Sequence, residues 1–142
     1  MSIRMNEEVD EAALRYAVGL VTQRYPYFCV ELQKQGSQWG FVENSRPIVV
    51  LHSPAGVELN SAAANYHLLA FSWHVDCIDM DVSHALTDAT GAIEVVRTLL
   101  YYYCSQRYGI ALSTGHIRLA GDVIPSEEWE DPAPRFSEEP PG

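Results

Sequence analysis

The segment that most constrains the fold is residues 80–91, MDVSHALTDATG, in which a predicted strand gives way to a predicted helix. The residues leading into it alternate between apolar and polar, as in a strand with one buried face, with Ile78, Met80 and Val82 on that face. The residues after it place apolar side chains at helical spacing, at Ile93, Val96 and Leu100. Asp88 or Thr90 can cap this helix. His84 is therefore expected at the carboxyl end of a strand, where α/β proteins commonly bind ligands.

The periodicity and turn residues along the rest of the chain predict an α/β fold with two long helices. These helices are expected at residues 9–24, followed by Pro26, and at residues 91–107, ended by Tyr108 and Gly109. Strands are expected at residues 2–5, 27–33, 39–42, 66–75 and 77–83, with a short apolar stretch at 48–51 and a loop at 53–64. We therefore predict a two-layer α/β sandwich, whose sheet is mostly antiparallel or mixed and carries both helices on one face.

Residues 82–109, VSHALTDATGAIEVVRTLLYYYCSQRYG, resemble the motif region of the chloramphenicol-acetyltransferase-like superfamily, which includes condensation domains of peptide synthetases and alcohol acetyltransferases. The hallmark of that superfamily is H-H-x-x-x-D-G, followed by a helix that packs on the sheet. Upstream, residues 8–28 resemble its first helix and the following strand, and residues 66–82 resemble the strand pair that leads into the motif. The resemblance covers roughly residues 3–120 and implies the N-terminal half of the fold.

The motif is matched at some positions and altered at others. His84 matches the second histidine, the one to which the superfamily's catalysis is assigned, and Asp88 matches the aspartate that orients the site. Ser83 stands where the first histidine is found, and Ala89 stands where the glycine is found. Full members have two similar halves with the active-site tunnel between them, and a D-F-G-W-G motif in the second half. This chain contains one half and no such motif.

The resemblance implies acyl transfer from a coenzyme A thioester to an alcohol or an amine, with the acyl-coenzyme A as co-substrate and no bound cofactor. Such a reaction needs a base for the acceptor's proton, and imidazole suits that role because its unperturbed pKa lies near neutrality. We expect His84 to be the base, Asp88 to fix the local backbone or to pair with Arg97 or Arg118, and Ser83 and Thr87 to be substrate-binding candidates by proximity.

Two alternatives remain open at this stage. His84 can instead be a histidine that ends a strand, with its ring bound to a backbone carbonyl. The chain can correspondingly be a non-catalytic remnant or a truncated product that acts as a binding or interaction module. The catalytic hypothesis requires completion by a second half-domain or by self-association, and a small molecule as acceptor.

Composition predicts one globular domain, residues 1–124, and an acidic, proline-rich tail, residues 125–142. The 142 residues are 47% hydrophobic, enough for one core. The tail has six acidic residues and one arginine, so it carries half of the net charge of −10. Such a tail is expected to be disordered or loosely draped over the domain. The alternative is a partner-binding segment anchored by Trp129 and Phe136.

The sequence also limits the partners. We predict a cytoplasmic protein with no membrane span, because it has neither an apolar run of about 18 residues nor an apolar signal core. The sequence has no stripe of basic residues of the kind that would indicate nucleic-acid binding. The three consecutive tyrosines, 101–103, must point in different directions, which favours either an exposed apolar interface for a homo-oligomer or second half, or coverage by residues 117–129.

The cysteines and the remaining histidines give no sign of a metal site. The spacing of the remaining histidines matches no metal-binding motif; they are His52, His67, His74 and His116. The three cysteines are an odd number without metal-like spacing, and we expect all of them to be buried, reduced thiols: Cys29, Cys77 and Cys104.

Overall fold

The computed structural model describes residues 1–110, 112, 115, 117–129 and 136–137. Its main sheet has four strands in the order β1 (Ser2–Arg4), β6 (Cys77–Val82), β5 (Leu69–His74) and β4 (Val50–His52). Neighbouring strands are antiparallel except β4 and β5, which run parallel. The sheet is therefore mixed, as predicted. Residues 2–4 form an edge strand that pairs with β6.

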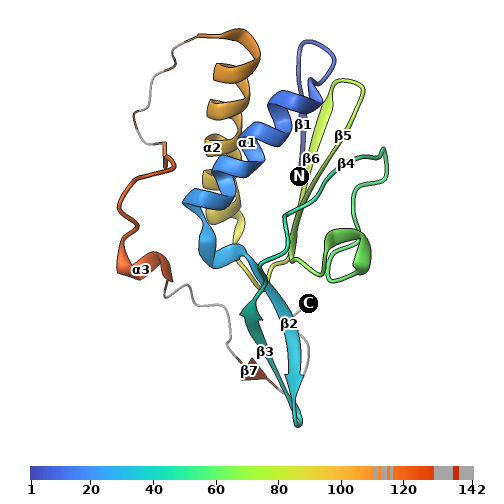
Figure 1. Cartoon of the computed structure of the whole chain (residues 1–142), viewed down its shortest axis with the longest axis vertical. Coiled ribbons are helices and arrows are strands. Elements are labelled where there is room, and N and C mark those ends of the chain that lie inside the picture. The colour runs from blue at the N-terminus through green and yellow to red at the C-terminus, as the bar shows by residue number, and fades with distance from the viewer. Residues whose placement is uncertain (111, 113–114, 116, 130–135, 138–142) are drawn as a thin grey trace.

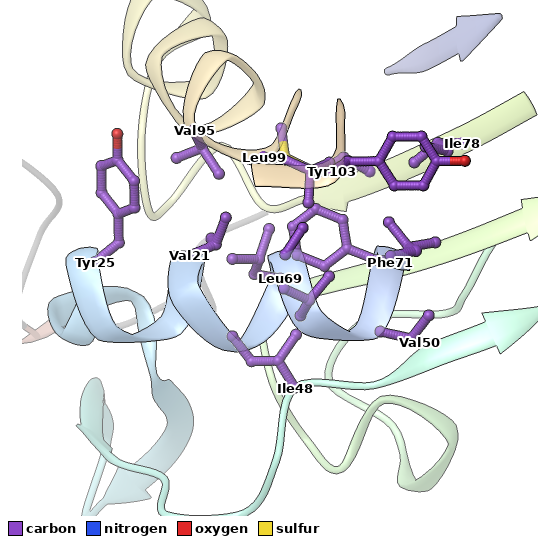
Figure 2. Close-up of a cluster of buried hydrophobic side chains, with 14 of the residues drawn as sticks. Val21, Tyr25, Ile48, Val50, Leu69, Phe71, Ile78, Val95, Leu99 and Tyr103 are labelled. Carbon is purple, nitrogen blue, oxygen red and sulfur yellow. The ribbon is translucent and has the colours of Figure 1, made fainter. Parts of the chain in front are cut away.

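Two long helices, α1 (Glu11–Arg24) and α2 (Ala89–Tyr108), cover one face of this sheet (Figure 1). The side chains between the helices and the sheet form a continuous apolar core (Figure 2), which includes Val21, Phe71, Ile78, Val95 and Leu99. Alternation along β5 places Leu69 and Phe71 in this core, whereas Ala70 lies in a smaller cluster on the other face with Val57 and Ala64. The predicted fold class, an α/β sandwich with two long helices on one face, is confirmed.

A second sheet is built on the hairpin of β2 (Val30–Gln35) and β3 (Gln38–Glu43), which points away from the main sheet (Figure 1). The short strand β7 (Phe136–Ser137) pairs with β3. The predicted strand at residues 27–33 begins late, because Pro26–Phe28 form a 3₁₀ turn. This turn is stabilised by aromatic packing, with Tyr25 stacked on Phe28 and Tyr27 in edge contact with Phe28.

Residues 117–129 run back along α2 toward its N-terminal end (Figure 1). Tyr103 is buried, and its hydroxyl accepts a hydrogen bond from the Asp10 backbone N–H. The Tyr102 hydroxyl accepts one from the Ala120 backbone N–H at 2.9 Å. Tyr101 remains half-buried beside a groove of about 600 Å³ on α2. Coverage by the C-terminal segment therefore applies to Tyr102, while Tyr101 lines a groove that Leu112, Gly115 and Ile117 also line.

The short helix α3 (Ser126–Trp129) lies within the predicted tail and is bound to α1 through Glu128 and Arg24. A charged pair therefore holds residues 126–129, and the expectation that most of the tail is disordered or loosely draped remains a prediction. Residues 130–135 and 138–142 lie outside the described part of the chain. The same holds for the side chains of Trp129 and Phe136, so their predicted anchoring role remains a prediction.

Other described features bear on the sequence predictions. No helix in the described part of the chain is long and apolar enough to cross a membrane. The three cysteines are free and half-buried rather than fully buried. Burial raises the pKa of the Cys29 thiol to about 11 and also raises that of Cys104, which makes these thiols poor nucleophiles. Within the described residues, no group of three or more His, Cys, Asp or Glu side chains is arranged to hold a metal; His116 lies outside them.

Candidate functional site

His84 lies in a tight turn directly after β6, as the sequence predicts. The Ser83 N–H extends the strand pairing by donating to the Leu68 carbonyl, and the Leu86 N–H closes the turn on the Ser83 carbonyl at 3.0 Å. The Ser83 hydroxyl accepts a further hydrogen bond from the Ala85 N–H at 3.1 Å. Because Ala85 and Leu86 are buried, the turn is fixed and His84 points outward. Its ring is exposed and has no hydrogen-bond partner among the described residues.

Asp88 fixes the local backbone by capping α2. Its carboxylate accepts a hydrogen bond from the Gly91 N–H at 2.9 Å, which satisfies one of the unpaired donors at the start of the helix. The alternative partners that the sequence suggested are engaged elsewhere, since Arg97 pairs with Glu94 at 3.2 Å and Arg118 lies 3.7 Å from Glu128. Of the two residues considered as caps, the structure thus selects Asp88.

A pocket of about 310 Å³ brings three of the four predicted site residues together, namely His84, Thr87 and Asp88. Ser83 does not line it, and its hydroxyl is occupied within the turn. Thr87 is 6% exposed and packs against Gly91 at the first turn of α2. A Cβ atom on Gly91 would lie only 1.9 Å from the Thr87 Oγ1, so any larger residue there would force the Thr87 side chain to move.

The other walls of the pocket come from Arg118, which the sequence suggested as a partner of Asp88, and from residues that sequence reasoning missed. Tyr27 and Phe28 contribute from the 3₁₀ turn, and the C-terminal segment contributes Arg118, Glu127 and Glu128. No local spacing connects these residues with the motif at residues 80–91. The one available signal is chemical: an arginine that ends an otherwise apolar helix face needs an anionic partner, and the tail is rich in acids.

An ion pair between Arg24 and Glu128 dominates the electrostatics of this wall. Both guanidinium Nη atoms donate to the carboxylate at 2.9 Å, and the Tyr27 hydroxyl donates to Glu128 Oε2 at 2.8 Å. The side chains are nearly inaccessible, at 3% exposure for Arg24 and 12% for Glu128. The hydrogen bonds from Arg24 lower the pKa of Glu128, while burial and the bond to Glu128 raise the pKa of Tyr27. Near neutral pH, Arg24 and Glu128 are therefore charged and Tyr27 is neutral.

Comparisons with known proteins identify the fold. No protein-family model and no curated protein sequence matches the chain. Among solved structures, it is similar to the SgcC5 protein from Streptomyces globisporus, with a TM-score of 0.60, 19% identity and 79% of this chain covered. It is also similar to polyketide synthase associated protein 5 from Mycobacterium tuberculosis, with a TM-score of 0.61, 17% identity and 87% coverage. It is similar as well to the starter condensation domain of rhizomide synthetase RzmA, with a TM-score of 0.56, 12% identity and 79% of this chain covered.

The chain spans about a third of each of these proteins, 30%, 31% and 33% of their lengths, respectively. At these identities the similarity concerns the fold. The fold that the predicted resemblance implies is therefore confirmed, and the chain corresponds to a part of each of these structures.

Proposed function

We propose that the chain supplies the histidine-bearing half of an acyl-transfer site, in which His84 is the general base for transfer from a coenzyme A thioester to an alcohol or an amine. The observation that carries the proposal is the position of His84, which is exposed on a fixed turn at the mouth of a pocket that Thr87 and Asp88 also line. A histidine that merely ended its strand would have its ring against a carbonyl, whereas the ring of His84 is free among the described residues.

In the proposed reaction, a ring nitrogen of His84 takes the proton of the acceptor's hydroxyl or amine while the acceptor attacks the thioester carbonyl. A C–O or C–N bond forms, and the carbonyl oxygen becomes an oxyanion. The C–S bond then breaks, and the leaving thiolate takes the proton from the imidazolium, which regenerates the base. Thr87 is the better placed of the two predicted substrate-binding residues, because it lines the pocket and Ser83 does not. Asp88 acts as a positioning residue through the cap of α2.

The proposed site is incomplete in the single chain, since the half-domain corresponds to about a third of the solved structures it resembles. We propose that a second copy or a separate second half-domain supplies the missing wall. The apolar groove beside Leu100, Tyr101 and Cys104 offers surface for such an association.

A non-catalytic remnant that serves as an interaction module is the second candidate. The observation that favours it is the change at two motif positions, Ser83 and Ala89. The two candidates differ in what they require of His84: acyl transfer depends on its ring, whereas an interaction module does not.

The test is thiol release from acetyl-coenzyme A in the presence of a panel of alcohols and amines, with the oligomeric state measured in parallel by sedimentation. We expect His84→Ala to lower acceptor-dependent turnover by roughly a hundredfold. His74→Ala is a matched control, because His74 is also exposed but lies at the opposite end of the β5–β6 pair. Equal activity of the His84→Ala variant and the wild type, or no acceptor-dependent release in an oligomeric sample, would leave the interaction module as the function.

A further inference from the structure

We propose that two arginines and a tyrosine beside the His84 pocket form a binding site for a carboxylate or phosphate group, and that the chain's own Glu128 occupies it as an internal ligand. The three side chains are Arg24, Tyr27 and Arg118. This inference concerns binding alone and does not depend on the acyl transfer proposed above.

The geometry around the Glu128 carboxylate is that of a bound anion. Arg24 contacts both of its oxygens in the bidentate arrangement that a guanidinium forms with carboxylates and phosphates, with both distances 2.9 Å. The Tyr27 hydroxyl donates a third hydrogen bond, and Arg118 Nε lies 3.7 Å from Oε1. Groups from two distant parts of the chain, residues 24–27 and Arg118, thus converge on one carboxylate.

The donors are held in place by parts of the chain other than α3. Arg24 ends α1, and its guanidinium lies over the Tyr25 ring at 5.1 Å. Tyr27 is packed edge-on against Phe28. The backbone at Arg118 is fixed to α2, because the Thr98 hydroxyl donates to the Arg118 carbonyl at 2.6 Å. A site built in this way keeps its shape when its anion is exchanged.

The groups around Glu128 can bind a ligand with more acceptor oxygens than a carboxylate has. Two guanidinium groups lie within 4 Å of the Glu128 carboxylate, and the Nε of the buried Arg24 has no hydrogen-bond partner in the described structure. A buried guanidinium requires an anion nearby, which explains why the chain provides one. A phosphate monoester carries nearly two negative charges at neutral pH and presents more acceptor oxygens than Glu128 does.

The attachment of Glu128 allows it to leave the site. The segment is fixed at Ala120, whose N–H donates to the Tyr102 hydroxyl, and residues 121–123 are exposed, Val123 by 92%. The helix α3 that follows has four residues, and a single turn of helix is unstable on its own. An anion that binds the arginines in place of Glu128 therefore displaces a short, weakly structured element and leaves the core unchanged.

The test measures binding of inorganic phosphate to the full chain at constant ionic strength, by NMR titration of the Arg24 Nε–H and Tyr27 ring resonances. We expect Glu128→Gln to bind phosphate at least about tenfold more tightly than the wild type, because the competing carboxylate is gone. Glu8→Gln is the control, since it removes the same charge from an exposed side chain at the opposite end of α1 from Arg24, and it should resemble the wild type. Adding Arg24→Gln to Glu128→Gln should abolish the binding.

Equal phosphate affinity of the wild type and Glu128→Gln, or binding that survives the loss of Arg24, would overturn the proposal. Glu128→Ala carries the same expectation and replaces Glu128→Gln if that variant does not fold. A parallel titration with acetate separates the two sources of the ligand group. Tighter binding of phosphate supports a phosphate ester, and tighter binding of acetate supports a carboxylate.

Discussion

The two motif residues that the resemblance pairs, Asp88 and His84, should contribute very differently to stability. Asp88→Ala removes the side-chain hydrogen bond that caps the 20-residue helix α2, which the Asp88 carboxylate accepts from the Gly91 N–H at 2.9 Å. Loss of such a cap typically costs about 1 kcal/mol in the free energy of unfolding. For a chain of 142 residues, this corresponds to a fall of about 3 °C in Tm. His84→Ala removes an exposed ring without a hydrogen-bond partner in the described structure, and should change stability by less than about 0.5 kcal/mol.

Thermal and urea unfolding of both variants measure this difference, and two further variants provide controls. Asp88→Asn keeps a side-chain oxygen that can cap the helix, so it should be nearly as stable as the wild type. Asp10→Ala removes the equivalent cap of α1, where the aspartate accepts from the Ala13 N–H at 3.1 Å, and should cost a similar amount. The reasoning is refuted if His84→Ala is the more damaging substitution, or if Asp88→Asn is as destabilising as Asp88→Ala.

Two other predictions follow from the pocket. Gly91→Ala should destabilise the chain by about 1–3 kcal/mol, because its Cβ would lie 1.9 Å from Thr87 Oγ1 in a buried setting; an unchanged Tm in thermal unfolding would contradict this. Hydrogen bonds from Arg24 lower the pKa of Glu128 in the folded chain. The ion pair therefore stabilises the fold fully at pH values above the unfolded pKa of a glutamate, about 4.3. This stabilisation is lost as the pH falls from that value through the lower pKa of the folded chain. The stability of the wild type should therefore decline more steeply below that pH than that of Glu128→Gln, as measured by urea unfolding across the acid range, and parallel pH profiles would refute the assignment.

Most of the fold could be predicted from the sequence because the features that determine it are local. The alternation of Ile78, Met80 and Val82 in β6 is observed, because Ile78 and Met80 lie in the core and Val82 packs against it. The helix α2 is also observed, but it turns Ala92, Val95 and Leu99 to the core, whereas Ile93 of the predicted face is exposed. The clustering of His84, Thr87 and Asp88 was predictable for the same reason, since a four-residue turn and a helix cap bring them together without help from distant segments.

The pocket wall around Arg24 and Glu128 was not predicted because it depends on long-range contacts, which produce no periodic pattern in a single sequence. Arg24 and Glu128 are 104 residues apart, and nothing near either residue specifies the other. The late start of β2 has a different origin, because Pro26 and the packing of Tyr25 on Phe28 favour a 3₁₀ turn over residues that have high strand propensity. Aromatic residues there pack within the turn, so tertiary contacts override the local preference.

The two altered motif positions do not disturb the geometry that presents His84. The Ser83 hydroxyl bonds the Ala85 N–H, which is the interaction that a serine at the first position of a turn commonly makes, and this helps to close the turn. Ala89 opens α2 at an exposed position, where alanine is favourable for a helix. The motif can therefore change at both positions while the histidine keeps its place. Whether the pocket supports chemistry then depends less on the motif than on its opposite wall, which in this chain is formed by a segment that Glu128 holds in place.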